Sequence, residues 1–225
     1  MRLSGITFGF ALTLAIFVRL EKQEAGVYFT AFAIIMFVTS IIRLGMDDIL
    51  LKNAALYQSS MERKLKAHQS FLECLLLAFT VYGITRCLYI FLEEYVLRLF
   101  GEQLFLVIES LIWLPLLHSI LSLLSIFFQG AGHANISIFG LTMLGQLISI
   151  IALFLFDGIQ AETLGGIVTA ANGFAVIFSA AFYVGLFGSQ VLKGIPFQQA
   201  GIREGLIQYL PLWIVVISAQ VFQWG

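Results

Sequence analysis

The segment SIIRLGMDDILLKNAALYQSSMERKLKAHQS, residues 40–70, is the one long stretch of the chain in which charged residues collect. It begins at the end of one apolar run and stops where another begins. Of the 12 lysines and arginines in the chain it holds Arg43, Lys52, Arg63, Lys64 and Lys66. A basic connection between two apolar runs is typical of the loops that set the orientation of a membrane protein.

The composition outside this segment supports the same class. Hydrophobic residues make up 60% of the 225 residues, charged residues only 11%, and the mean hydropathy is +0.98, whereas soluble domains carry about 25% charged residues. The net charge of -1 gives no basic field, so nucleic acid is excluded as a partner. The composition therefore predicts an integral membrane protein with the lipid bilayer as its surroundings.

Hydropathy divides the chain into runs long enough to cross a hydrocarbon core of about 30 Å as helices. The alternation of a membrane β-barrel strand is not found. We expect an all-α polytopic bundle of six complete transmembrane helices, with a seventh reaching the C-terminus. The six are predicted at 3–20, 26–45, 70–92, 103–128, 135–156 and 164–190, and the seventh at 207–224.

Lysine and arginine in the short loops predict the orientation. With the N-terminus in the cytoplasm, the even-numbered connections are cytoplasmic, and most of the basic residues then lie inside. Those inside are Arg2, Arg43, Lys52, Arg63, Lys64, Lys66, Lys193 and Arg203, against Arg19, Lys22 and Arg98 outside. The expected location is a multi-pass protein of the inner (plasma) membrane.

Residues 46–68 have helical periodicity. From Asp47 onward an apolar face recurs at spacings of three and four, formed by Leu50, Ala54, Tyr57, Met61 and Leu65. We predict a cytoplasmic amphipathic helix on the inner leaflet, with Arg63, Lys64 and Lys66 contacting anionic headgroups. The alternative is a plain loop that only satisfies the positive-inside rule.

Two charged residues fall inside predicted spans, where charge is costly and suggests a functional site. Arg86 lies near the outer end of the third span and Glu109 near the outer start of the fourth, so both should reach the same depth. The pair is either a static ion pair that fixes helix register, or part of a central cavity in which protonation of Glu109 frees Arg86 for an anionic substrate.

Weaker candidates are single polar residues in apolar spans. His118 lies near the middle of the fourth span, and it either bonds a neighbouring helix or relays protons. Asn172 and Gln146 either bond between helices or touch substrate. We take His118 and Asn172, with Arg86 and Glu109, as the candidate cavity residues.

The sequence lacks the common motifs of nucleotide-binding, catalytic and metal sites. It contains no phosphate-binding G-x-x-x-x-G-K-[ST] loop, no H-E-x-x-H, no G-x-S-x-G and no cluster of cysteine and histidine. Cys74 and Cys87 lie about 20 Å apart along one predicted helix, too far to pair. We therefore expect no enzyme activity, no cofactor, no metal site and no disulfide.

Several landmarks carry a family resemblance. An opening span ends in Arg19, a turn closes with EAGVY (Glu24–Tyr28), and the second span ends in RLGMDDIL (Arg43–Leu50). The fourth span ends in FFQGAGHAN (Phe127–Asn135), and LIQYLPLWIVVISAQVFQW covers Leu206–Trp224. In this pattern the chain resembles the N-terminal half of the Wzx-type O-antigen flippases, which belong to the multidrug/oligosaccharidyl-lipid/polysaccharide exporter superfamily.

The resemblance implies a fold of two six-helix lobes that open alternately to either side of the membrane. Residues 1–190 would form the first lobe, 191–206 a cytoplasmic linker, and 207–225 the first helix of a second lobe that is missing, truncated or supplied by a partner subunit. The implied activity is movement of an isoprenoid-diphosphate-linked oligosaccharide from the inner to the outer leaflet for surface polysaccharide synthesis, coupled to H⁺ or Na⁺.

Two other functions remain open. A multidrug or cation exporter of the related MATE kind would share the fold, but its cavity should be acidic, and Arg86 favours an anionic substrate. A truncated, non-transporting membrane protein would account for one lobe without the other. An enzyme of the glycan pathway is disfavoured because no catalytic cluster is found.

Overall fold

The protein is described from a computed structural model, which places residues 2–43, 45–57, 60–138 and 143–191. Throughout these residues the regular structure is helical, without strands. The helices in chain order are α1 (Arg2–Arg19), α2 (Lys22–Arg43), α3 (Met46–Ala55), α4 (Met61–Phe100), α5 (Glu102–Ser110), α6 (Leu114–Gly130), α7 (Ala134–Ile138), α8 (Leu144–Leu155) and α9 (Ala161–Val191).

Four helical stretches are long and apolar enough to cross a membrane, as judged by length and composition. They are Lys22–Arg43, Met61–Phe100, Glu102–Gly130 and Ala161–Gly188. Two shorter apolar helices, Thr7–Arg19 and Leu144–Leu155, accompany them. The all-helical membrane class is thus confirmed, while the count of six spans stays a prediction. The predicted seventh span and the linker before it lie outside the described residues.

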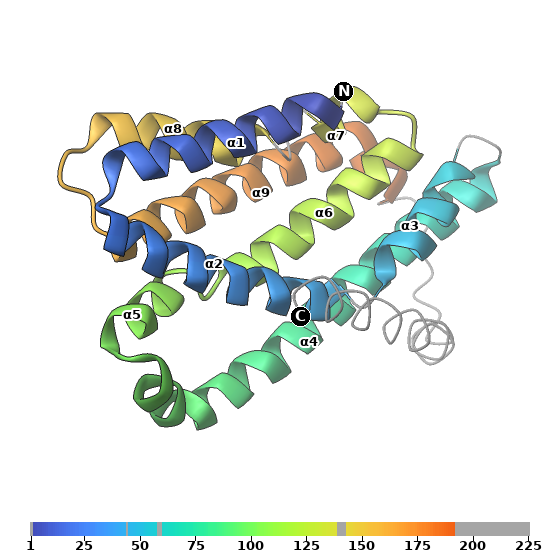
Figure 1. Cartoon of the computed structure of the whole chain (residues 1–225). Coiled ribbons are helices and arrows are strands. Elements are labelled where there is room, and N and C mark those ends of the chain that lie inside the picture. The colour runs from blue at the N-terminus through green and yellow to red at the C-terminus, as the bar shows by residue number, and fades with distance from the viewer. Residues whose placement is uncertain (1, 44, 58–59, 139–142, 192–225) are drawn as a thin grey trace.

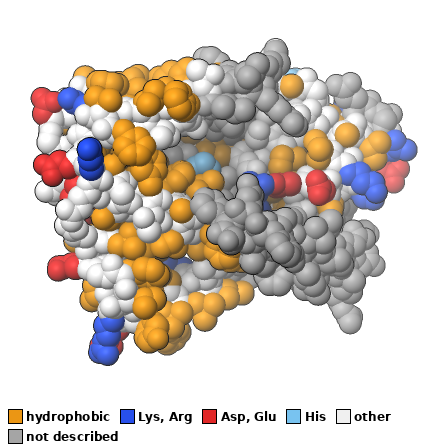
Figure 2. All heavy atoms as spheres, in the orientation of Figure 1, with side chains coloured by type: hydrophobic (Ala, Val, Ile, Leu, Met, Phe, Trp, Pro, Cys, Tyr) orange, Lys and Arg blue, Asp and Glu red, His pale blue; other side chains and the backbone are white. Residues whose placement is uncertain are grey.

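On the face that Figure 2 shows, hydrophobic side chains cover much of the described surface, and most of the charged side chains stand at its left edge and on its right side. One end carries the turns between α1 and α2 and between α8 and α9, and the other carries α3 (Figure 1). This distribution is the one expected of helices whose apolar lengths face lipid.

The predicted fourth span is broken in two. Helix α5 ends at Ser110, a short turn follows, and α6 begins at Leu114. Pro115 stands in the first turn of α6, where a missing backbone N–H costs nothing. In the interior of a helix continuing from α5, the same proline would remove a hydrogen bond and break the helix. The turn is tightened by hydrogen bonds from the N–H of Ile112 to the carbonyl of Glu109 and from Leu114 to Leu111.

The predicted amphipathic helix over 46–68 is also two elements. Helix α3 ends at Ala55, and α4 starts at Met61 after Ser60, whose side chain accepts a hydrogen bond of 3.3 Å from the backbone N–H of Arg63. Such a serine cap starts a new helix because it satisfies an N–H left free in the first turn. Residues 61–68 therefore belong to the 40-residue α4.

The apolar face of α3 packs against protein. Met46, Leu50 and Ala54 are fully buried, spaced four residues apart, and belong to a core shared with α4, α6 and α9. Gly130 at the end of α6 lies directly against the backbone of Ala54. The prediction that this face lies on the inner leaflet is therefore wrong for α3, because α6 occupies it.

Two hydrophobic cores run along the bundle. The first lies toward the α3 end and includes Leu50, Phe71, Leu121 and Phe127. The second lies toward the α1–α2 turn and includes Ile16, Tyr28, Leu111, Leu153 and Val168. Tyr89 of α4 still packs against the second core. Beyond it the helix is exposed, since Phe91 is 86% exposed and Tyr95 70%, and Figure 1 shows this part of the helix running out to α5.

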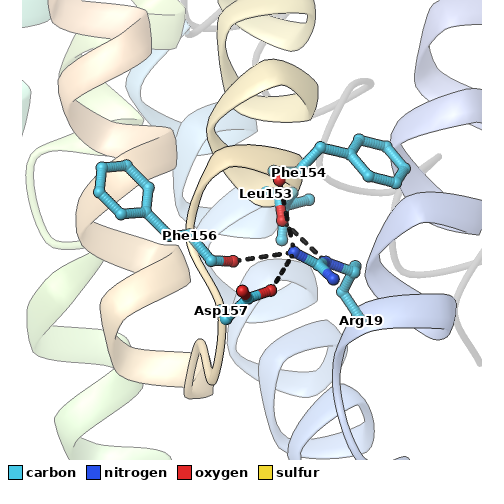
Figure 3. A network of polar contacts seen from close by, with 5 residues as sticks. All are labelled: Arg19, Leu153, Phe154, Phe156 and Asp157. Atoms are coloured by element: carbon cyan, nitrogen blue, oxygen red, sulfur yellow. Dashed lines mark hydrogen bonds and ion pairs between the residues drawn. The ribbon is translucent and has the colours of Figure 1, made fainter.

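Polar contacts join two helical turns at the second core's end. The guanidinium of Arg19, the last residue of α1, donates to the carbonyls of Leu153 at 2.9 Å and Phe156 at 3.0 Å and pairs with Asp157 at 2.9 Å (Figure 3). It thereby satisfies carbonyls at the C-terminus of α8, where a cation is favoured.

Glu24, in the first turn of α2, completes this contact. Its carboxylate accepts a hydrogen bond of 2.6 Å from the N–H of Ala161, the first residue of α9. A carboxylate at a helix N-terminus is favoured for the same electrostatic reason. We call Arg19 and Glu24, with the groups they bond, the turn clamp: it fixes the α1–α2 turn to the α8–α9 turn.

Candidate functional site

A half-open cavity of about 290 Å³ lies between α1, α2, α6, α8 and α9, and apolar as well as polar side chains line it. We call it the polar cavity. It is bordered by Leu121 of the first core and Val168 of the second, so it lies where the two cores meet. Its polar lining consists of Thr39, Arg43, His118, Ser122, Ser125, Gln146, Ser149 and Asn172. Polar and charged groups on otherwise apolar helices of a membrane bundle are costly, which makes this cavity the candidate site.

Three helices bring these side chains to one place through their periodicity. Thr39 and Arg43 stand four residues apart on α2, and Gln146 and Ser149 stand three apart on α8. On α6, His118 is followed at helical spacing by Ser122 and Ser125. Each set therefore forms a polar stripe on one helix face. These stripes were the signal in the sequence that could have found the cavity.

Arg43 is the charged residue of the described cavity lining. It is the last residue of α2 and pairs with Asp47, one turn further along in α3. The side chains of Arg43 and Asp47 are 36% and 26% exposed, so the pair is half-buried. The Nε of Arg43 is buried and has no hydrogen-bond partner among the described residues. Sequence reasoning used Arg43 as a topology signal and as part of the RLGMDDIL landmark, but not as a site residue.

The predicted candidates His118 and Asn172 both line this cavity. The amide of Asn172 donates to the carbonyl of Val168 at 2.8 Å, and its oxygen faces Gly145 across the α8–α9 contact. Gln146, on α8, has a buried amide oxygen without a hydrogen-bond partner in the described part of the chain. The cavity thus holds a cation and polar groups with unused bonding capacity.

The other two candidates lie elsewhere. Arg86 on α4 and Glu109 on α5 approach to 3.5 Å, so the predicted ion pair is confirmed. Their side chains are 31% and 33% exposed, and Arg86 stacks over the ring of Tyr89 at 5.1 Å. Arg86 lines a separate, apolar cavity of about 130 Å³ against a different face of α2. The four predicted cavity residues therefore lie in two places, with His118 and Asn172 in the polar cavity and Arg86 with Glu109 in the ion pair. The role of Arg86 and Glu109 in substrate binding stays a prediction.

The three basic residues predicted to touch lipid headgroups stand in the first turns of α4. Arg63 and Lys66 are exposed, and Lys64 is half-buried with its Nζ 5.5 Å from the ring centre of Tyr57. Burial raises the pKa of Tyr57, which keeps its hydroxyl neutral beside this cation. Headgroup contact by Arg63, Lys64 and Lys66 stays a prediction.

An aromatic cluster near the α3 end was missed by sequence reasoning. His68 of α4 is 1% exposed, and its Nδ1 lies 2.7 Å from the hydroxyl of Tyr183 on α9. The rings of Tyr57, Phe127 and Phe187 surround it at 5.1 to 5.4 Å between centres. The cluster ties α4, α6 and α9 together. Its signal in the sequence was a histidine at the start of a span whose buried face continues through Phe71.

Metal-ligating side chains do not cluster in the described part of the chain. Among the described residues, no three His, Cys, Asp or Glu side chains gather closely enough to hold a metal ion. Cys74 is buried, Cys87 is exposed, and both are free thiols. The arrangement can therefore bind and orient a polar or charged group, chiefly through Arg43, His118 and Gln146.

Comparison with known proteins adds no relative, since no family model, curated protein or solved structure matches this chain.

Proposed function

We propose that this chain is a lobe of a membrane transporter that flips an isoprenoid-diphosphate-linked oligosaccharide from the inner to the outer leaflet. The process would supply surface polysaccharide synthesis and would work by alternating access coupled to H⁺ or Na⁺. In this proposal α1 and the α7–α8 segment complete six transmembrane passes, the N-terminus is cytoplasmic, and a second lobe or partner subunit encloses the substrate.

One observation carries the proposal: a polar cavity, with Arg43 at its edge, inside an all-helical bundle of membrane character. Ionisable groups within membrane bundles mark substrate or ion pathways, because lipid offers them no compensation. A structural scaffold would gain nothing from leaving a hollow of about 290 Å³ beside its two cores, because protein interiors are normally close-packed.

The lining also bears on the choice between transporter classes. The described residues around the cavity include an arginine and no aspartate or glutamate. A site for organic cations should carry the opposite charge, so the lining favours an anionic substrate such as a lipid diphosphate over the cations of a MATE-like exporter.

The proposal is tested by depleting the full-length protein in its own host. Right-side-out and inside-out membrane vesicles are then treated with a membrane-impermeant periodate reagent that oxidises exposed sugar. We expect lipid-linked glycan to become trapped on the inner leaflet, and therefore to be oxidised mainly in the inside-out vesicles.

Two strains sharpen the assay. His118→Leu should reproduce the trapping, whereas Arg98→Gln, which changes an exposed arginine on α4 paired with Glu94 at 2.6 Å, should transport normally. Unchanged glycan distribution after depletion would refute the flippase function. Retention of a fluorescent organic cation in the depleted cells, with normal glycan, would favour the cation exporter instead.

A further inference from the structure

The charge of the polar cavity defines what it can hold. Arg43 is the one lysine or arginine among its described lining residues, and no carboxylate accompanies it there. Moving a cation into such a site would place like charges together, while an anion would gain from the guanidinium in a medium of low dielectric constant. The lining residues therefore favour a negative group over a cation, and Asp47, just outside the lining, neutralises Arg43 while the cavity is empty.

Three side chains can donate hydrogen bonds to that group. Arg43 offers the N–H groups of its guanidinium, because its side chain lines the cavity and is 36% exposed. His118 offers a ring N–H, and the amide of Gln146 can turn over to present either its oxygen or its NH₂ group. The hydroxyls contribute less, because Thr39 and Ser149 each donate at 2.8 Å to a carbonyl of their own helix.

The size of the cavity limits the group. A volume of about 290 Å³ lies at the lower end of small-molecule sites, which run from about 300 to 1,000 Å³. A phosphate or diphosphate fits in such a space, but an oligosaccharide does not. The guanidinium of arginine also matches the geometry of phosphate oxygens better than an ammonium group would.

Asp47 stands outside the described cavity lining but holds the same guanidinium. Its second oxygen, Oδ1, is buried without a hydrogen-bond partner among the described residues. We propose that the cavity binds a phosphate-class anion through Arg43, His118 and Gln146, and that Asp47 competes with this anion for Arg43. The carboxylate of Asp47 keeps Arg43 neutralised while the cavity is empty. An incoming phosphate displaces this carboxylate or shares the guanidinium with it.

The anion has two sources, a free phosphate compound and the diphosphate of an isoprenoid lipid. The second source rests on the proposed function, and it deepens that function by assigning the diphosphate to this cavity. The sugar portion of the lipid would then extend outside it. Anion binding itself does not depend on transport.

The test uses the full 225-residue chain in lipid nanodiscs and isothermal titration calorimetry. The probes are inorganic diphosphate, farnesyl diphosphate as a short isoprenoid diphosphate, and tetramethylammonium as a cation of comparable size. We expect both diphosphates to bind and the cation to give no heat. Arg43→Gln should weaken diphosphate binding by about 10-fold to 150-fold, because it removes a hydrogen bond to a charged group.

Asp47→Asn gives a test of opposite sign. If Asp47 competes for Arg43, removing its charge should tighten diphosphate binding, by up to roughly fivefold for a partly exposed ion pair that no longer has to be broken. Gln146→Glu keeps the shape of the side chain and adds a negative charge, so it should abolish binding. Arg98→Gln is the matched control and should bind as the unmodified protein does.

The outcomes separate the possibilities. Unchanged or weakened binding in Asp47→Asn overturns the competition, and retained binding in Gln146→Glu overturns the site, even if Arg43→Gln fails to fold. Tighter binding of farnesyl diphosphate than of inorganic diphosphate identifies the lipid source, and equal binding identifies the free anion. Binding of diphosphate together with normal glycan distribution in depleted cells would leave the anion site standing and remove the flippase function.

Discussion

Replacement of Gly130 by alanine tests whether α3 packs into the bundle. A Cβ added at Gly130 would overlap the Cβ of Ala54 and would lie 2.9 Å from the carbonyl carbon of Ala54 and 3.0 Å from the nitrogen of Ala55. Two of these atoms belong to the backbone, so no side-chain rotation can relieve the overlap and the two helices must separate.

Overpacking of this kind costs about 1–3 kcal/mol, and the rigid backbone places Gly130→Ala in the upper half of that range. Against this stands the gain of about 0.5–1 kcal/mol from replacing glycine by alanine in a helix. The net loss is therefore about 1–2.5 kcal/mol, which corresponds to a fall in melting temperature of about 2–10 °C for a chain of this size.

The assay is thermal unfolding of the purified protein in detergent, followed by tryptophan fluorescence. The matched control is Gly83→Ala on α4, where nothing lies within 4 Å of the added Cβ, so only the helix gain should remain and the melting temperature should rise. Adding Ala54→Gly to Gly130→Ala should restore part of the loss. A melting temperature that rises in Gly130→Ala as it does in Gly83→Ala would refute the contact between α3 and α6.

Further substitutions test other contacts by the same measurement. Gly165→Ala should lower the melting temperature because its Cβ would overlap a side chain of α5. Gly166→Ala, with open space around the added Cβ, should not lower it. Equal changes of melting temperature in the two variants would contradict the packing of α9 on α5. Arg19→Gln should lower it by removing a charged donor worth about 1.5–3 kcal/mol from the carbonyls of α8, and an unchanged value would show that the turn clamp does not form. Arg86→Met should reduce folded protein by leaving Glu109 unpaired, and Glu109→Leu in the same chain should restore it; a double variant no better than the single would argue against the pair.

The sequence predicted those helices that follow from the length of a hydrophobic run alone. Runs of adequate length indicated helices in lipid, and matching depths along two runs predicted that Arg86 would meet Glu109. The break before Pro115 was not predicted, because a proline in an apolar run is equally compatible with a kinked helix and with two helices.

Placement of α3 required tertiary information. Leu50 and Ala54 make an apolar face that looks the same whether lipid or another helix covers it. What decides between them is the absence of a side chain at Gly130, which lets the two helices approach, and this pairing joins residues far apart in the chain. The cavity was predicted only in part, through His118 and Asn172. The contribution of Arg43 was missed for a similar reason, because polar stripes on α2, α6 and α8 become a site only when these helices face one another.

The turn clamp has a consequence for synthesis. Arg19 bonds groups that lie 134 to 138 residues later in the chain, and Glu24 bonds one that lies 137 residues later. At about 5–20 residues per second, a ribosome needs roughly 7–28 seconds to deliver those partners after Arg19 has been made. During this interval α1 and α2 carry the charged side chains of Arg19 and Glu24 without their partners in the turn clamp. Until α8 and α9 have been made, water or a chaperone has to satisfy the polar groups of this first turn.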